Sequence, residues 1–360
     1  MLSRQLVSRP LLLSCHSSSS YTHYQQSDHN ELCKFGIRRS SSLVDRIKNT
    51  AARGKNAYLK FLGRHFPTLY QYQMQVLNGV LDLKRDALIF FQMTKALRTG
   101  GKLSTYTRQE LLAYQEISQQ KIKLVPVVVI TALPFSVLFL PLLFAWPGIF
   151  LTSHFMSDAQ RTSVELNKLE HKLSYCQSVL DDFALKVEKL PSHKRSRKTA
   201  EEILDKLEKG LSIRVSEILL IADIFEDRKY RMHNIPYRYR MHLAHCNELR
   251  IKNVTRDNQI QFFIDKALAK STASALTDSE LKWTCFKHGA NPTVMSRSDQ
   301  VNYINRWIEF INQVNETHMP LLLHGVVFFG YNHPSNLKMK ENLGLKWKRK
   351  SHHHERNPNN

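Results

Sequence analysis

"KIKLVPVVVITALPFSVLFLPLLFAWPGIFLTSHF" spans residues 121–155, and it decides how the rest of the chain is interpreted. Between Lys123 and His154 it holds no formally charged residue. A bilayer core about 30 Å thick needs roughly 20 apolar residues in a helix, and this run exceeds that length. We therefore expect a single transmembrane helix over residues 124–150. A buried helix of a soluble domain, or a re-entrant pair of helices, is the alternative.

Prolines interrupt this apolar run. Proline in a helix interior removes a hydrogen bond and clashes with the preceding turn, but membrane helices tolerate it better than soluble ones. Pro134 and Pro141 are seven positions apart, so both lie near one face and their bends add. We expect the transmembrane helix to be kinked at Pro126, Pro134, Pro141 and Pro147.

The composition is strongly basic, with a formal net charge of +21 over 360 residues. Such a balance predicts affinity for anions, either nucleic acid or acidic phospholipid, although a solvated basic face is the ordinary alternative. Cysteines stand at positions 15, 33, 176, 246 and 285, an odd number without a CxxC pair. This usage predicts reduced thiols rather than a disulfide framework.

The first 40 residues have the composition of a mitochondrial transit peptide. Arg4, Arg9 and eight serines precede the first acidic residue, Asp28. Leaders of this kind are rich in arginine and serine and poor in acids. The apolar patch at 10–13 is too short for a secretory signal, and a disordered tail is the alternative.

Elsewhere the hydrophobic spacing predicts an all-α fold, because alternating strand patterns flanked by hairpin turns are nearly absent. Residues 41–120 form an expected N-terminal helical region, in which Thr107 and Glu110 match a capping box that starts a helix. After the apolar run, helices are expected over 158–189, 199–209, 214–227, 236–250, 257–270, 277–288, 298–314 and 319–330. Residues 336–360 are expected to be a basic disordered tail.

Several blocks together resemble the mitochondrial LETM family over roughly residues 90–330. The first is "YTRQELLAYQEISQQKIKLVPVVVITALPFSVLFLPLLFAWPGIF", and the family pattern falls here on Thr107, Arg108, Glu110, Leu124, Val125, Pro126, Pro134, Phe135, Pro141 and Pro147. "IFEDRKYRMHNIPYRYRMHLAHCNEL" at 224–249, "LTDSELKWTCFKHGAN" at 276–291 and "RWIEFINQVNETHMPLLLHGVVFF" at 306–329 resemble the soluble domain of that family.

The resemblance implies an inner-membrane protein with one span and its C-terminal domain in the matrix. It implies a 14-3-3-like helical ribosome-binding domain over 155–335 that associates with mitochondrial ribosomes. Family members affect cristae shape, respiratory-complex biogenesis and cation balance, so a role in mitochondrial structure is expected. A homo-oligomer is left open, and no small-molecule substrate is inferred.

One departure from the long family members bears on transport. They place an acid two positions after the Pro-Phe phenylalanine, where this chain has Val137. An ionisable group inside the bilayer is the usual sign of a proton or cation path, and this run has none. The missing acid argues against a cation/proton exchanger, so exchange is kept only as an alternative function. A scaffold that binds cardiolipin and shapes cristae is a second alternative.

A basic, tyrosine-rich stretch is the candidate binding surface. Cations interleaved with aromatic rings suit an RNA backbone and its exposed bases, and the same cations attract anionic lipid. A solvated loop is the alternative. The candidate residues are Arg228, Lys229, Tyr230, Arg231, Tyr237, Arg238, Tyr239, Arg240, Arg250 and Lys252.

The sequence favours neither a metal site nor an enzyme. His242, His245 and Cys246 are spaced to share a metal on a helix, yet a structural zinc wants four ligands, so ordinary packing is preferred. Cys285 and His288 can be drawn as a nucleophile and base, but packing is again preferred. Phosphate-loop, dinucleotide and nucleophile-elbow motifs are absent. We expect no catalytic residue and no cofactor.

Overall fold

The computed structural model describes residue 57 and residues 59–132, 140–226 and 234–349. The chain divides into two compact parts, residues 1–67 and 68–360. In the first part, residues 59–65 are helical, and the Phe61 and His65 rings lie 4.8 Å apart. The expected transit peptide lies outside the described residues.

The second part is built from helices, and the described residues contain no strand. This confirms the all-α prediction for the described chain. The α-helices are α2 Pro67–Arg98, α3 Arg108–Ala132, α4 Leu140–Ala145, α5 Pro147–Phe150, α6 Asp158–Glu188, α7 Arg195–Glu208, α8 Val215–Leu219, α9 Ala222–Glu226, α10 Tyr237–Cys246, α11 Val254–Leu268, α12 Asp278–Lys287, α13 Arg297–Gln313, α14 Met319–Gly330 and α15 Leu337–Asn342.

Local signals start and end several of these helices, although the helix expected over 214–227 is two short helices, α8 and α9. The Thr107 backbone N–H donates to Glu110 Oε2 at 2.8 Å, and the Glu110 N–H donates to Thr107 Oγ1 at 3.3 Å, which confirms the capping box. Helix α2 ends before Gly100, whose φ of +93° is a conformation that glycine adopts without steric cost. Further capping boxes begin α6 at Ser157, α12 at Thr277 and α13 at Ser296.

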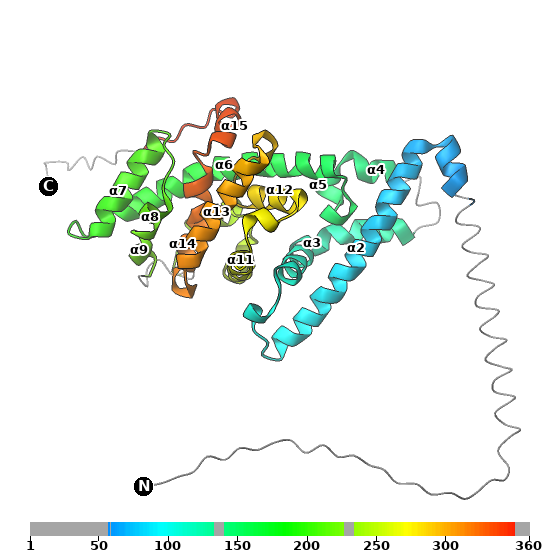
Figure 1. The fold of residues 1–360 in the computed structure, drawn as a ribbon, viewed down its shortest axis with the longest axis horizontal. Helices are drawn as coiled ribbons and strands as arrows, with labels where there is room; N and C mark the ends of the chain where they lie inside the picture. The colour runs from blue at the N-terminus through cyan, green and yellow to red at the C-terminus, as the bar shows by residue number, and fades with distance from the viewer. Residues whose placement is uncertain (1–56, 58, 133–139, 227–233, 350–360) are drawn as a thin grey trace, which may run out of the picture. The chain divides into compact units, whose positions relative to one another are not determined.

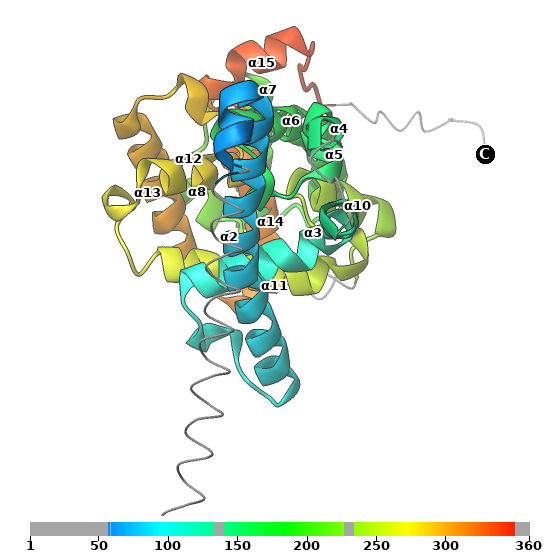
Figure 2. The same cartoon turned by 90° about the vertical axis from the view of Figure 1, so that its right-hand side faces the viewer.

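Helix α6 is the long helix against which the C-terminal helices pack (Figure 1). It contacts α7, α10 and α14 and buries one continuous stripe of apolar side chains. Helix α14 lies between α10 and α13 (Figure 2), and every residue from Pro320 to Gly330 is buried. Gly325 allows this close packing, since a Cβ there would lie 3.0–3.1 Å from the rings of Trp307 and Phe310.

Helices α2 and α3 extend this core toward the N-terminus. Met93 of α2 and Leu111 and Tyr114 of α3 form one buried cluster with Ile260 and Ile264 of α11. Burial of this cluster, at roughly 25 cal/mol per Å² of apolar surface, holds the N-terminal helical region against the C-terminal helices. The packed unit therefore begins well before residue 155, where the sequence analysis placed the start of the C-terminal domain.

The apolar run does not form one helix in the structure. Helix α3 is described up to Ala132, residues 133–139 lie outside the described part, and the short helices α4 and α5 follow. Lys123 Nζ donates to the Gly148 carbonyl at 2.5 Å, and the Ser153 N–H donates to Gln120 Oε1 at 3.2 Å. A straight helix would separate residues 123 and 148 by about 38 Å. The two flanks of the run therefore lie side by side. Among the helices that the structure describes, none combines the length and the apolar character that crossing a bilayer requires.

The prolines occupy different positions from those expected. Pro126 lies inside α3, which continues to Ala132, and Pro134 lies outside the described residues. Pro141 is the second residue of α4 and Pro147 is the first residue of α5. The first turn of a helix tolerates proline because its N–H has no intrahelical partner there. Pro147 thus lies at the start of a helix and not at a kink within one, and Pro141 is the second residue described for α4.

The C-terminal segment also differs from the expected disordered tail. Residues 337–342 form α15, and Trp347 is buried against the core. The Trp347 indole N–H donates to Asp181 Oδ1 at 2.8 Å, and its backbone N–H donates to the Tyr331 hydroxyl at 3.0 Å. These contacts order residues 336–349, and residues 350–360 lie outside the described part.

Candidate functional site

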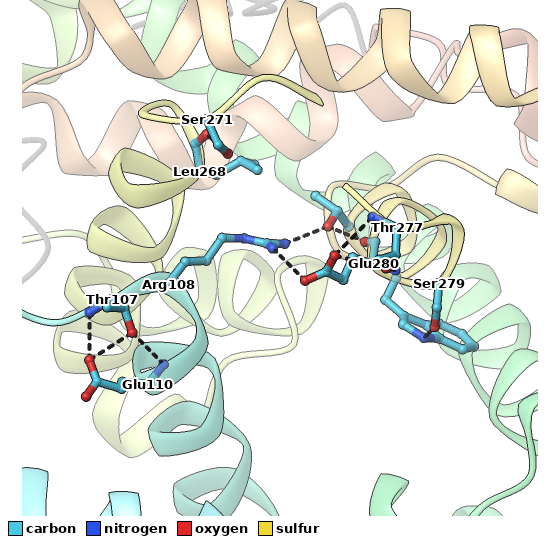
Figure 3. Close-up of polar contacts among 10 residues, drawn as sticks. Thr107, Arg108, Glu110, Leu268, Ser271, Thr277, Ser279 and Glu280 are labelled. Carbon is cyan, nitrogen blue, oxygen red and sulfur yellow. Dashed lines mark hydrogen bonds and ion pairs between the residues drawn. The ribbon is translucent and has the colours of Figure 1, made fainter. Parts of the chain in front are cut away.

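The first turn of α3 reaches across to α12. The capping box at Thr107 fixes where α3 begins, and the next side chain, Arg108, extends toward α12 (Figure 3). One guanidinium nitrogen donates to Thr284 Oγ1 at 2.9 Å, and the other lies 3.8 Å from Glu280. Glu280 is held in place because it also accepts from the Thr277 N–H of its own capping box. The Thr-Arg-x-Glu pattern of the sequence therefore joins two helices as well as starting one.

Behind Arg108 lies a cavity of about 230 Å³ between α3, α6, α11 and α12. Its wall carries mixed charge, and some of that charge is paired. Lys168 contacts Glu165 and Glu248, and Lys172 contacts Glu248 at 2.8 Å. Burial alone would raise the pKa of Glu248, but the ammonium groups of Lys172 and Lys168 hold it well below its usual range. Glu248 is therefore ionised at neutral pH.

Other polar atoms of this cavity have no hydrogen-bond partner within the described chain. They are Arg108 Nε, Arg161 Nε, Gln119 Nε2 and Asp265 Oδ2. Buried polar atoms normally bind a partner or ordered water, so the cavity suits water or a small polar ligand. The Arg161 guanidinium also lies 4.3 Å from the centroid of the Trp283 ring. The arrangement can bind a small polar molecule.

The candidate basic surface is only partly described. Arg228, Lys229, Tyr230 and Arg231 lie outside the described residues. Tyr237, Arg238 and Lys252 are exposed, and Tyr237 keeps 61% of its surface. Arg240 is half-buried, and its guanidinium lies 5.8 Å from the Tyr237 ring centroid. These four residues present the cation and aromatic character that the sequence predicted.

Two members of the predicted set have structural roles. Tyr239 is buried, and its hydroxyl hydrogen-bonds His324 Nε2. Arg250 donates from its backbone N–H and two guanidinium nitrogens to Asp257, and from a third nitrogen to the Ser118 carbonyl at 2.9 Å. Asp257 retains only 1% of its side-chain exposure. Arg250 thus fastens α3 to α11, and Tyr239 belongs to the core, which does not fit a binding role for either residue.

The histidines and cysteine of α10 each have a different partner. His242 Nδ1 lies 2.8 Å from Asp182 Oδ2, and the His245 ring stacks on Tyr175 with centroids 4.5 Å apart. Cys246 Sγ lies 3.2 Å from Cys176 Sγ in the core. Because each of these side chains faces a different partner, His242, His245 and Cys246 are not arranged as the ligands of one metal ion.

Cys285 and His288 have different surroundings, and these do not suit a nucleophile and its base. Burial raises the pKa of the Cys285 thiol to about 12, so the group is protonated at neutral pH and is a poor nucleophile. The His288 ring stacks on Trp307 with centroids 4.0 Å apart. Cys285 packs in the core, and His288 packs on Trp307 while its Nε2 lies 3.4 Å from Asp265 Oδ1.

Comparison with known protein families shows the family of this chain. A family model described as LETM1-like, RBD, matches residues 106–328. The chain belongs to this family. The match begins two residues before α3, includes the apolar run, and ends within α14. It therefore covers both the polar cavity and the candidate basic surface.

Curated relatives extend the likeness over most of the chain. The human protein named LETM1 domain-containing protein 1 is 25% identical over 301 residues, which cover 79% of this chain and 81% of the relative. The Xenopus tropicalis protein of that name is 23% identical over 313 residues, which cover 83% and 88%. No solved structure matches the chain. The 14-3-3-like arrangement stays a prediction.

Proposed function

We propose that this chain is a mitochondrial inner-membrane protein whose helical domain lies in the matrix and binds mitochondrial ribosomes or an assembly partner. In this way it supports respiratory-complex biogenesis and mitochondrial structure. The observation that carries the proposal is the match of residues 106–328 to a family described by its RBD, which we take to be the ribosome-binding domain. The exposed residues Tyr237, Arg238 and Lys252, together with the half-buried Arg240, give this domain a surface suited to RNA.

The mechanism is a gain in effective concentration. A membrane anchor confines a weak binding surface to two dimensions, so that a ribosome engaged at the membrane meets it repeatedly. No covalent bond changes. Because phosphate contacts release counterions, binding through this surface is expected to weaken steeply as salt rises.

Exposed apolar side chains support the anchor. Ile122 keeps 79% of its surface, and Val125, Val129, Trp146 and Ile149 are also exposed. These residues occupy both flanks of the apolar run, which suits contact with lipid. We expect the full chain to stay with the membrane in alkaline carbonate, and its release would remove the anchor and the tether together.

The segments before and after the apolar run contact each other at Lys123 and Gly148. This contact favours a re-entrant run that enters and leaves the membrane on the same side, whereas the length of the run predicts a single pass. Ser104 precedes the run and Ser163 follows it, and both are exposed. Each is changed to cysteine in a chain without Cys15 and Cys33, and mitoplasts are treated with an impermeant thiol reagent. Equal reactivity at both positions indicates a re-entrant run, and reactivity at one of them indicates a single pass.

Ribosome binding is tested by co-sedimentation of the full-length chain in mild detergent over a series of salt concentrations. The variant R238Q/R240Q/K252Q is compared with K84Q/K95Q/R98Q, which removes the same charge from exposed positions of α2. Only the first variant should lose affinity, and its slope of log affinity against log salt should fall by about 2. Absence of co-sedimentation at every ionic strength would refute the tether.

Two other outcomes would support the alternatives. Salt-sensitive binding to cardiolipin vesicles without ribosome association would favour a lipid-binding scaffold. Robust cation flux in liposomes that contain the purified chain would favour an exchanger, although Val137 leaves the run without an ionisable group.

A further inference from the structure

Three side chains that can ligate metal meet at the base of the apolar run. Asp86 belongs to α2, Glu116 to α3, and His154 to the short helix Ser153–Phe155 that follows α5. One ligand atom from each lies within 4.8 Å of the others, and His154 Nε2 is 3.0 Å from Asp86 Oδ2. The side chains of His154 and Asp86 are only 5% and 12% exposed. Distant parts of the chain thus bring two carboxylates and an imidazole into one shielded place.

The charges of this cluster are incompletely balanced. Arg85 Nε contacts the other oxygen of Asp86, Oδ1, at 3.0 Å, but the Arg85 side chain is 67% exposed, so water screens it. Gln120 Nε2 donates to Glu116 Oε1 at 3.3 Å and adds no charge. Asp86 is buried and Glu116 is half-buried, and two carboxylates this close repel each other unless a positive charge lies between them. A bound cation would supply that charge.

The surroundings of His154 favour a metal on Nε2. Thr152, which is fully buried, places Oγ1 3.4 Å from His154 Nδ1. If Nδ1 carries the proton and donates to Thr152, then Nε2 presents its lone pair to the carboxylates. Histidines that bind metal usually donate the other ring N–H to such a partner, which fixes the tautomer. Gly79 lets this segment approach α2, since a Cβ there would lie 2.6 Å from the His154 carbonyl oxygen.

We propose that Asp86, Glu116 and His154 form a divalent metal site. One imidazole with two carboxylates suits a transition-metal ion such as Zn²⁺, whereas Ca²⁺ prefers oxygen ligands alone. Zn²⁺ ligands bound at about 2.0–2.2 Å in tetrahedral geometry lie roughly 3.4 Å apart. Asp86 and His154 already have a similar spacing, and rotation of Glu116 completes the set, with water at the fourth position. The ion would fasten α2, α3 and the segment after the apolar run to one another.

The test titrates the full-length chain in mild detergent with Zn²⁺ by calorimetry, and with Co²⁺ by visible absorption. All proteins carry His352, His353 and His354 changed to alanine, because a histidine tail binds metal by itself. We expect one equivalent of Zn²⁺ to bind and the Tm to rise with Zn²⁺ concentration, as for any ligand of the native state. Tetrahedral Co²⁺ should give intense visible bands.

Conservative variants assign the site. Asp86→Asn and Glu116→Gln should each weaken Zn²⁺ binding by about 100-fold or more, and Thr152→Val, which keeps all three ligands, by about 10- to 100-fold. Asp82→Asn is the matched control, because Asp82 is an exposed carboxylate one turn earlier on α2; it should leave binding unchanged. If His154 and Asp86 form only an ion pair, the chain will show no saturable Zn²⁺ binding and no dependence of Tm on Zn²⁺. Either that result, or binding that survives both Asp86→Asn and Glu116→Gln, overturns the proposal. Ribosome co-sedimentation is measured separately, so either proposal can fail without the other.

Discussion

Replacement of Arg250 distinguishes a binding residue from a structural one. Arg250→Ala removes two side-chain hydrogen bonds to Asp257 and one to the Ser118 carbonyl. The backbone N–H of residue 250 remains, but Asp257, which is 1% exposed, loses its charge partner. Removal of one partner of a buried ion pair costs about 3–5 kcal/mol. Since Arg250 is 28% exposed and water can reach the pair, we expect the lower value, about 3 kcal/mol.

That loss should be visible in thermal unfolding. At about 2.1 cal/mol/K of unfolding entropy per residue, the part 68–360 shifts its Tm by somewhat under 2 °C per kcal/mol, so Arg250→Ala should lower Tm by about 5 °C. Lys252→Ala is the matched control, because Lys252 is an exposed cation two positions away and should change Tm by little. The assay is calorimetry of the full-length chain in mild detergent. An unchanged Tm for Arg250→Ala, with weaker ribosome binding, would refute the structural role and restore Arg250 to the binding surface.

Three further substitutions test the core. Gly325→Ala should cost about 1–3 kcal/mol in urea unfolding, since its Cβ would press on the rings of Trp307 and Phe310; an unchanged midpoint would show that α13 yields. Trp347→Ala should cost about 3–5 kcal/mol because it empties a buried site, and a smaller loss would mean that the C-terminal segment is loosely attached. Burial lowers the pKa of His324 from 6.5 to about 3, so its neutral form stabilises the fold above pH 6.5 and the contribution falls as pH drops. Between pH 7 and 5 the loss is about 2 kcal/mol, and His324→Gln should flatten the measured pH profile by that amount.

Helix positions could be predicted because their signals are local. The sequence placed a helix at 158–189, and α6 covers Asp158–Glu188; it placed another at 319–330, which are the bounds of α14. A cap and an apolar stripe of period 3.6 are enough for such predictions. Residues 336–349 illustrate the limit. Their composition is basic and polar, yet Trp347 is held by Tyr331, 16 positions earlier, and by Asp181, 166 positions earlier.

The candidate site shows the same limit more strongly. A cation in the sequence does not show which acid it faces, so Arg250 looked like part of a binding surface when it belongs with Asp257. Tyr239 could not be distinguished from Tyr237 by pattern, although one is buried and the other exposed. The sequence could have indicated Arg108, since it stands in the Thr-Arg-x-Glu pattern, but not its partner Thr284 on α12. The three possible metal ligands are 30 or more positions apart, and only the fold brings them together.

The apolar run shows why length alone cannot settle topology. An uncharged stretch of this length satisfies the bilayer criterion whether it forms one helix or two shorter ones. What separates the two cases is the position of the flanks, since one helix holds residues 123 and 148 about 38 Å apart and a returning chain can bring them into contact. Here Lys123 bonds the Gly148 carbonyl and Gln120 bonds the Ser153 N–H, so both flanks share one end of the run. The groups that make these contacts are polar, they lie near the two ends of the uncharged stretch, and all four residues are half-buried. Polar contacts at the base with apolar surface beyond it are the arrangement that a re-entrant segment requires, because only the base need meet water.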